Sequence, residues 1–288
     1  MQVSTIADQL FFVTGFLSGS NSSTSWSGTG FVYTVPTDKG EVHLLVSNKH
    51  VLTDADTLTI RFVRGDPTKP EAPTLGEATE TTITDSKTLV VGHPDPAVDV
   101  AVMPLGPVIA AMAAAGAPPF FRALSPDLLL TDARAAELDS IEQVSFVGYP
   151  NAVFDTMHFT PVARRGTTAT PIMLDYRGEP AFLVDATVFP GSSGSPVFLS
   201  NTGTFQLRDG STVVGSRFLL LGVLAAVHMT QVDGKVTTLP ATKTVRVRTP
   251  IGLGIVYRAQ TIQTCVDLML DEWGLTPSPG APDVGVVS

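Results

Sequence analysis

Short apolar runs separated by turn residues recur along most of the chain, and they predict strands. The runs are rich in Val, Phe, Leu and Thr and end at Gly, Pro, Asn or Asp, as strands joined by turns do. So many short strands indicate an all-β sandwich or barrel, and the lack of alternating long helices argues against a parallel βαβ sheet. The clearest runs are 10–17, 30–35, 41–47, 57–63, 87–92, 99–105, 143–150, 180–188, 195–200, 217–228 and 242–250.

Two segments carry the pattern of a helix instead. The shorter one, 131–138, has Thr131 or Asp132 available as its N-cap. The longer one, 261–273, repeats apolar residues at intervals of three and four, and Gly274 is placed to end it. Cys265 lies on the apolar face of this helix and is expected to be buried rather than a reactive thiol. That face consists of Ile262, Cys265, Val266, Met269 and Trp273.

The distribution of these elements suggests two strand-rich halves. We expect the first half at about 8–105 and the second at about 141–256. A segment at about 106–140 joins them, and its first part is rich in Ala, Pro and Gly without a strand pattern. Residues 257–275 hold the longer helix, which we expect to pack on the two halves. The Pro- and Gly-rich tail 276–288 is expected to be mobile.

Composition indicates a globular protein with a substantial core. The chain has 288 residues, of which 43% are hydrophobic and 16% charged. It carries 18 basic and 27 acidic residues, so the formal net charge is −9. An acidic surface repels phosphate backbones, and we therefore expect no nucleic-acid partner. No apolar run is long enough to span a bilayer, so no membrane association is expected either.

The cysteine content, the spacing of the histidines and the first residues of the chain limit where the protein is expected to be located and which metal sites it could form. Cys265 is the only cysteine, which excludes an intrachain disulfide. The first residues lack the basic and apolar regions of a secretory signal, and together these features predict a cytoplasmic protein. A secreted chain numbered after removal of its signal would share them. No HExxH motif or Cys/His ligand set occurs, so we expect no metal and no other cofactor.

One segment, 189–198, places glycines around two serines between strand-like runs. A tight turn of this kind suits the presentation of a single hydroxyl. A serine hydroxyl becomes a nucleophile only when a base removes its proton, and the base needs a group to orient it. His50 ends one strand-like run and Asp99 opens another, so the chain carries histidine, aspartate and serine in that order. The occurrence of all three motifs in one chain, in this order, is much harder to obtain by chance than any one of them alone.

These motifs resemble those of the trypsin-like, chymotrypsin-fold peptidases, especially their HtrA-like and glutamyl-endopeptidase branches. The segment 185–196 is similar to the nucleophile motif and is the most specific part of the resemblance. The segments 47–51 and 99–102 are similar to the histidine and aspartate motifs. The segment 28–32 looks like the strand before the histidine motif, and 147–150 like the first strand of the second barrel.

The resemblance implies a chymotrypsin-like double six-stranded β-barrel over residues 1–256, followed by a C-terminal α-helix. Carried over by position, Ser193 is the nucleophile, His50 the general base and acid, and Asp99 the residue that orients His50. The backbone N–H groups of Gly191 and Ser193 would form the oxyanion hole, where such donors contribute on the order of 10²–10³ in rate each. No regulatory PDZ-like domain is expected after residue 256.

The same resemblance places the pocket for the substrate side chain. Thr187 and Val188 belong to its base, and Leu224, Ala225 and Ala226 to its walls. Trypsin-type enzymes carry an aspartate at the position of Thr187, so a preference for Arg or Lys is not expected. Glutamyl endopeptidases use a histidine and a threonine near Leu224 and Val188, which also argues against glutamate. The apolar lining favours small or aliphatic side chains.

Neighbouring residues compete for the same roles. Within the nucleophile motif, Ser192 precedes Ser193 and Ser195 follows Gly194, and both are interpreted as supporting residues. Ser192 stands where trypsin-type zymogens carry an aspartate, so that activation route is absent. Asp95 lies in a turn-like context, whereas Asp99 directly opens a strand-like run, which favours Asp99. His228 follows the predicted pocket wall, and both a structural and a functional role stay open for it.

The leading hypothesis is a serine endopeptidase that hydrolyses protein or peptide substrates through an acyl-enzyme on Ser193. A catalytically silent protease-fold module that binds other proteins is the alternative, because an unformed oxyanion hole leaves no trace in a sequence. An α/β-hydrolase esterase is disfavoured, since that fold needs G-x-S-x-G and the order serine, acid, histidine. The oligomeric state, the natural substrate and the means of regulation stay open.

Overall fold

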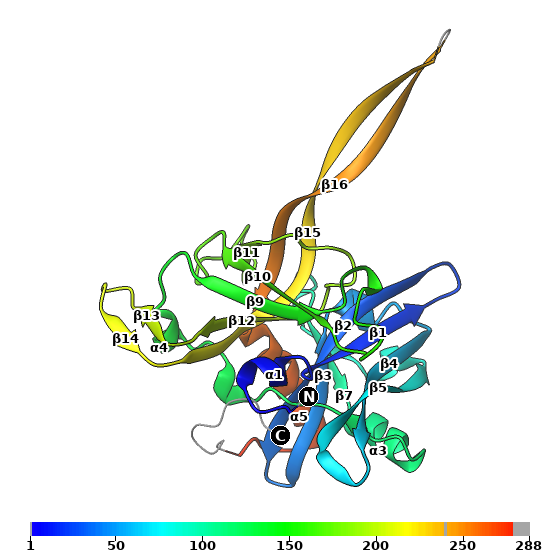
Figure 1. The fold of residues 1–288 in the computed structure, drawn as a ribbon, viewed down its shortest axis with the longest axis vertical. Coiled ribbons are helices and arrows are strands. Elements are labelled where there is room, and N and C mark those ends of the chain that lie inside the picture. Colours follow the sequence, from blue (N-terminus) through cyan, green and yellow to red (C-terminus); the bar gives the residue numbers. More distant parts are fainter. Residues whose placement is uncertain (1, 239–240, 279–288) are drawn as a thin grey trace.

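The molecule consists of a strand-rich first half, a closed barrel in the second half and a helix near its C-terminal end (Figure 1). This arrangement confirms the predicted all-β class with a C-terminal helix. The computed structural model describes residues 2–238 and 241–278, and between 226 and 250 it describes the backbone alone. Across the described residues, no helix is long and apolar enough to cross a membrane.

The first half forms one antiparallel sheet, which in the described residues has eight strands in the order β5-β4-β1-β2-β3-β7-β6, with β8 paired to β4. Each of the six predicted runs contains a strand, but in the run 87–92 only Val91–Gly92 is strand, because Ser86–Leu89 forms a 3-10 helix, and the run 10–17 becomes strand only from Thr14 on. Strands β5 and β8 are additional. The long β5 escaped prediction because it is an edge strand rich in Thr and Glu that stays largely exposed. The strands are β1 (Thr14–Ser20), β2 (Ser25–Thr37), β3 (Gly40–Ser47), β4 (Thr57–Asp66), β5 (Lys69–Thr84), β6 (Val91–Gly92), β7 (Ala101–Pro104) and β8 (Pro119–Phe120).

The second half closes into a six-stranded barrel over the described residues, in the order β10-β11-β16-β15-β12-β9. Its closure agrees with the predicted six-stranded barrel. Five of the six strands coincide with predicted runs. The sixth, β10, carries two arginines and no continuous apolar run, so its sequence gave no signal. The strands are β9 (Gln143–Gly148), β10 (Val162–Thr168), β11 (Ala181–Asp185), β12 (Pro196–Asn201), β15 (Arg217–Thr238) and β16 (Ala241–Arg258).

The connecting segment contains regular structure that the sequence pattern did not predict. Helix α3 (Gly106–Ala114) is rich in alanine, the residue with the highest helix propensity. The predicted helix at 131–138 is present in a shorter form as α4 (Asp132–Ala135), and the Thr131 side chain caps it by accepting from the Arg134 N–H. The remaining elements are α1 (Ile6–Leu10), α2 (Lys49–Leu52), η1 (Ser86–Leu89), η2 (Pro126–Leu128), η3 (Pro150–Ala152), β13 (Thr204–Gln206) and β14 (Thr212–Val214).

Helix α5 (Gln260–Trp273) packs where the two halves meet, and Gly274 ends it in the left-handed conformation, as predicted. Ile262 and Cys265 are fully buried in it. They belong to one apolar cluster that also includes Phe31 of the first sheet and Val223 of the barrel. Burial raises the pKa of the Cys265 thiol to about 12, which agrees with the predicted inert role. The helix therefore packs against both halves through one apolar cluster.

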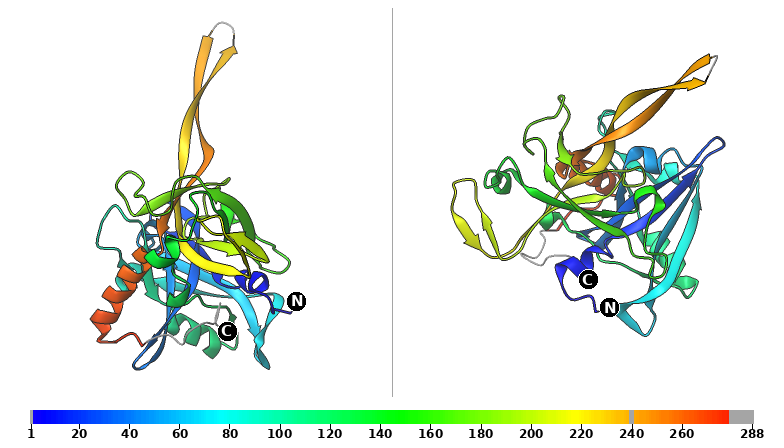
Figure 2. Two further views of the ribbon diagram at one scale, coloured as in Figure 1. Left: turned by 90° about the vertical axis from the view of Figure 1, so that its left-hand side faces the viewer. Right: turned by 45° about the horizontal axis from the view of Figure 1, so that its top comes forward.

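Strands β15 and β16 continue past the barrel as a long hairpin. They pair from Gly222 and Arg258 inside the barrel to Thr238 and Ala241 at the far end. Figures show this part as a twisted ribbon that projects from the body of the molecule (Figure 1, Figure 2). The side chain of His228, whose role stays open, lies outside the described residues.

The start of the predicted mobile tail is anchored on the first sheet. Thr276 donates its N–H to Asp38, and Ser278 donates its N–H to the carbonyl oxygen of Pro36. Pro277 forms a bridge with Thr37. Residues 276–278 are therefore held in place, in contrast to the mobile tail that was expected from residue 276 on. Residues 279–288 lie outside the described part of the chain.

Candidate active site

His50 stands on a single helical turn that follows strand β3. Val51 and Leu52 are buried in the core and anchor this turn, α2. His50 points the other way, and 46% of its side chain is exposed. The buried neighbours thereby fix the backbone while the imidazole stays accessible to a substrate.

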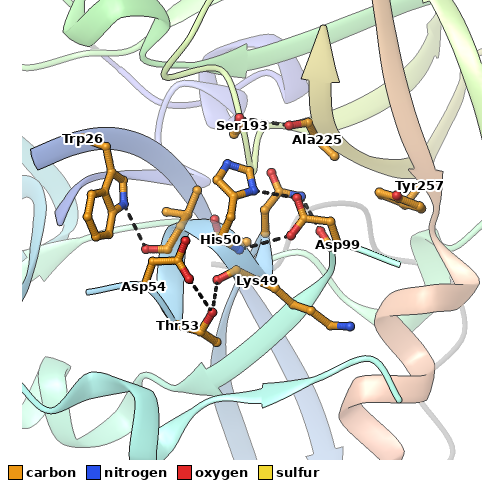
Figure 3. Close-up of polar contacts among 12 residues, drawn as sticks. Trp26, Lys49, His50, Thr53, Asp54, Asp99, Ser193, Ala225 and Tyr257 are labelled. Carbon is orange, nitrogen blue, oxygen red and sulfur yellow. Dashed lines mark hydrogen bonds and ion pairs between the residues drawn. The ribbon is translucent and has the colours of Figure 1, made fainter. Parts of the chain in front are cut away.

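Asp99 holds His50 at two points (Figure 3). The Nδ1 atom of His50 lies 2.6 Å from Oδ2 of Asp99, and the backbone N–H of His50 donates to Oδ1 at 3.1 Å. A carboxylate only accepts hydrogen bonds, so the Nδ1 atom carries the proton and Nε2 has a free lone pair in the neutral ring. The fully buried Asn48 donates from Nδ2 to the Asp99 carbonyl oxygen at 2.6 Å and steadies the loop.

The rival aspartate, Asp95, has a different role. Its carboxylate accepts the N–H of Ala97, which is the pattern of a turn cap. Its carbonyl oxygen accepts from Nζ of Lys49 at 2.8 Å. The structure therefore pairs His50 with Asp99 and leaves Asp95 to shape the loop.

Tyr257 braces the loop that carries Asp99. Its hydroxyl donates to the carbonyl oxygen of Ala97 at 2.7 Å, across from β16. Burial, and then the neighbouring Glu179 carboxylate, raise the pKa of Tyr257, so this hydroxyl stays protonated beside Asp99. In the part of the chain that the structure describes, no group of three His, Cys, Asp or Glu side chains is arranged to hold a metal ion.

Ser193 approaches this pair from the second half of the molecule. Figure 3 shows the His50 ring between Ser193 and Asp99. The Ser193 hydroxyl donates to the carbonyl oxygen of Ala225 at 3.0 Å, and not to His50. A hydroxyl has one proton, so a bond to Nε2 of His50 requires a rotation about one side-chain bond. The structure thus brings the three predicted residues to one place with the serine turned aside.

The other two serines of the motif are enclosed. Ser192 is 1% exposed and Ser195 is fully buried, whereas Ser193 is partly exposed. The hydroxyls of Ser192 and Ser195 also have no hydrogen-bond partner among the described residues. Of the three serines, Ser193 is the one that a substrate can reach.

Two glycines shape the turn that presents Ser193. Gly191 and Gly194 both have φ at +86°, a region that residues with a side chain rarely adopt. A Cβ on Gly191 would lie 2.5 Å from the Tyr149 carbonyl oxygen, and one on Gly194 would overlap the Thr29 carbonyl oxygen. Both positions therefore require glycine.

The backbone of this turn leaves two N–H groups without an acceptor among the described residues. The carbonyl oxygen of Pro190 accepts from the Asn151 N–H at 2.5 Å, and that of Ser192 accepts from the Ser195 N–H at 3.0 Å. In a trans peptide the N–H points opposite to the C=O. The N–H groups of Gly191 and Ser193 therefore point away from these acceptors, and neither donates to another described residue. Two unused donors remain on one turn.

Thr29, which the sequence interpretation did not single out, links the first sheet to this turn. Its N–H donates to the Ser193 carbonyl oxygen at 2.8 Å, and its hydroxyl donates to the Gly191 carbonyl oxygen at 3.0 Å. The same hydroxyl accepts the Tyr149 N–H, and its carbonyl oxygen accepts from the Ser47 hydroxyl. The one signal in the sequence is its place between two glycines, Gly28 and Gly30.

Two of the residues that the resemblance assigns to the substrate-side-chain pocket lie in the core of the barrel instead. Val188 is 2% exposed and Leu224 is fully buried, and both belong to the apolar core of the barrel. They cannot line an open pocket, because their side chains already fill the barrel interior. Thr187 is exposed, Ala225 is 4% exposed, and the side chain of Ala226 lies outside the described residues.

Comparison with known proteins places the sequence in a family. Residues 28–205 match the trypsin-like peptidase domain, a span that includes His50, Asp99 and Ser193. The chain belongs to the trypsin-like peptidases. This result confirms the predicted resemblance and the chymotrypsin-like fold class. The HtrA-like branch stays a prediction, and no curated protein matches this trypsin-like peptidase.

Several solved structures are similar to this trypsin-like peptidase at low sequence identity. The serine endoprotease from Yersinia pestis is 14% identical with a TM-score of 0.46, and the match covers 92% of this chain but 65% of that one. The thermostable serine protease AL20 from an extremophilic microorganism is 14% identical, with a TM-score of 0.48 and coverage of 91% and 98%. The catalytically inactive tobacco etch virus protease complexed with substrate is 12% identical, with a TM-score of 0.48 and coverage of 98% and 94%.

Proposed function

We propose that this trypsin-like peptidase is a serine endopeptidase that hydrolyses peptide bonds through an acyl-enzyme on Ser193. The observation that carries the proposal is the two-point hold of Asp99 on His50, beside a glycine turn with two unused N–H donors. A protein that only binds others has no need of either arrangement. Proteins or peptides would be its substrates.

The reaction would begin when the Ser193 hydroxyl leaves Ala225 and turns to His50. Oγ attacks the carbonyl carbon of the substrate while its proton passes to Nε2 of His50. Asp99 stabilises the imidazolium through the Nδ1–H bond and does not take up the proton itself. The negative charge that develops on the substrate oxygen is received by the N–H groups of Gly191 and Ser193.

Collapse of this intermediate would break the peptide bond. His50 returns its proton to the departing amine nitrogen, and the acyl group stays on Oγ of Ser193 as an ester. A water molecule then gives a proton to His50 and attacks the ester carbon. The second collapse releases the carboxylic acid and restores the Ser193 hydroxyl.

Peptide hydrolysis by matched serine variants tests this proposal. We expect Ser193→Ala to reduce hydrolysis of a fluorogenic peptide mixture by at least about 10³-fold. Ser211→Ala, on the exposed loop between β13 and β14, is the control and should leave the rate unchanged. Wild-type protein without activity, or an active Ser193→Ala variant, would instead favour the silent binding module. The Ser193 bond to Ala225 is the one observation that such a module would explain directly.

A further inference from the structure

Three neighbouring strands present hydroxyl side chains in two rows. Ser18 of β1 lies opposite Ser27 of β2 and opposite Thr59 of β4. Ser20 of β1 forms the second row, two residues further along. Because side chains alternate along a strand, positions two apart share one face of the sheet. The six residues of this hydroxyl surface are Ser18, Ser20, Ser25, Ser27, Thr57 and Thr59.

The hydroxyl surface borders a hollow of about 680 Å³ that reaches the nucleophile turn. Asn151, Pro190 and Gly191 form its other wall. Oγ of Ser27 lies 3.2 Å from the place where a Cβ on Gly191 would be. The first row of hydroxyls therefore starts directly beside the proposed oxyanion hole.

None of the side chains that line the hollow is ionisable, and its hydroxyls share the wall with the apolar side chains of Trp26 and Pro190. Ser20 and Thr57 share a hydrogen bond of 2.8 Å, and Thr59 bonds Thr82 on the neighbouring strand. Within the described residues, the side chains of Ser18 and Ser27 form no hydrogen bond. Each free hydroxyl is able to donate one hydrogen bond and accept two.

The position of the hollow decides which half of a substrate it meets. In the proposed reaction His50 gives its proton to the departing amine, so the leaving half of a substrate must lie beside His50 and the acyl half continues away from it. Trp26 of β2 donates from Nε1 to the Val51 carbonyl oxygen, next to His50. Figure 3 shows Trp26 and Ala225 on opposite sides of His50. The hollow at β1 and β2 thus lies toward the half that leaves as an amine.

We propose that the hydroxyl surface binds the first residues on the leaving side of the cut and selects small, uncharged polar side chains there, such as serine, threonine or asparagine. This inference rests on the proposed endopeptidase function. A polar side chain can replace the water that the hydroxyls of Ser18 and Ser27 lose. A large apolar side chain would leave these hydroxyls unsatisfied, and a carboxylate would be desolvated without a cationic partner.

Partition of the acyl-enzyme between water and added amines tests the inference, because it measures the leaving side alone. A small ester substrate forms the acyl-enzyme, and dipeptide amides Xaa-Ala-NH2 compete with water for it. Xaa is serine, its isostere 2-aminobutyrate, leucine or aspartate. We expect the ratio of aminolysis to hydrolysis to be about 3- to 10-fold higher for serine than for 2-aminobutyrate, and lowest for aspartate.

Substitutions in the hydroxyl surface test whether the preference for serine arises there. In the Ser18→Ala/Ser27→Ala double variant, the advantage of serine over its isostere should shrink to less than about twofold. Thr212→Ala, an exposed residue of β14, is the matched control and should keep the wild-type ratio. Equal ratios of aminolysis to hydrolysis for serine and 2-aminobutyrate on the wild-type protein would overturn the inference. This measurement does not depend on whether a variant folds. An unchanged serine advantage in a folded double variant would also overturn the inference.

The two proposals fail in different ways. Ester hydrolysis that Ser193→Ala abolishes, combined with equal ratios for all amines, would overturn the hydroxyl surface as a binding site and leave the endopeptidase standing. Absence of any Ser193-dependent ester hydrolysis would overturn both.

Discussion

At the scale of single residues, Asp99 combines two acceptor contacts that an amide cannot reproduce. Both His50 groups that face Asp99 donate hydrogen bonds, and an asparagine has only one acceptor oxygen. We expect Asp99→Asn to lower kcat by about 10³- to 10⁴-fold with little change in folding. Asp95→Asn is the control in the same loop, because the asparagine oxygen can still accept the single N–H of Ala97 that Asp95 accepts. Equal losses of kcat in the two variants would contradict the role given to Asp99.

Thr29 carries a second prediction at this scale. Valine has nearly the same shape as threonine, but Thr29→Val removes the donor to the Gly191 carbonyl and the acceptor of the Tyr149 N–H. We expect urea denaturation to show that the free energy of unfolding falls by about 1–3 kcal/mol, because the Gly191 carbonyl and the Tyr149 N–H both lose their buried partner. We also expect kcat to fall more than KM changes, because the turn that aims the N–H donors loosens.

Thr29→Ser retains the hydroxyl and is the matched variant. It should recover most of kcat while still lacking the methyl group. If kcat is the same in the valine and serine variants, Thr29 has a packing role only.

The sequence allowed His50, Asp99 and Ser193 to be proposed as a triad because each lies in a recognisable local motif. It did not reveal Thr29, whose bonds to Gly191 and Ser193 join segments more than 160 residues apart. The same limit explains why Val188 and Leu224 were assigned to the substrate-side-chain pocket although both are buried in the barrel core. Whether an apolar side chain fills the barrel or lines its mouth depends on closure of the sheet, and a local pattern of apolar residues is identical in both cases.

At the scale of elements, α5 clamps the two halves through one face. Ile262 is fully buried in the cluster shared by both halves, whereas Leu268 on the same helix is 42% exposed. We expect Ile262→Ala to lower the free energy of unfolding by about 2–5 kcal/mol. Leu268→Ala should change it by less than about 1 kcal/mol. Urea denaturation of the two variants measures both values, and similar losses would contradict the clamp.

Helix α5 was predictable because its apolar period is complete over three turns. Strand β5 was not, because an exposed edge strand has no apolar face to leave a pattern. Helix α3 lies in a stretch whose glycines and prolines suggested a linker, yet its interior is mostly alanine. In each case the burial of the element, more than its intrinsic propensity, decided whether the sequence revealed it.

At the scale of the whole molecule, the site draws on both halves. His50 and Asp99 come from the first half and Ser193 from the second, and one apolar cluster crosses the junction. We therefore expect a single cooperative unfolding transition in urea, with far-UV circular dichroism and tryptophan fluorescence coinciding. Trp26 and Trp273 lie at opposite ends of the chain and report different regions. Two separate transitions would contradict a shared core.

Labelling by a fluorophosphonate tests most directly whether Ser193 is an activated nucleophile. The reagent phosphonylates a serine Oγ and releases fluoride, and peptide mapping by mass spectrometry locates the adduct. We expect one adduct per chain, on the peptide that contains Ser193, and its loss in His50→Ala and in denatured protein. An adduct on any other residue, or folded protein that does not react, would contradict the proposed triad.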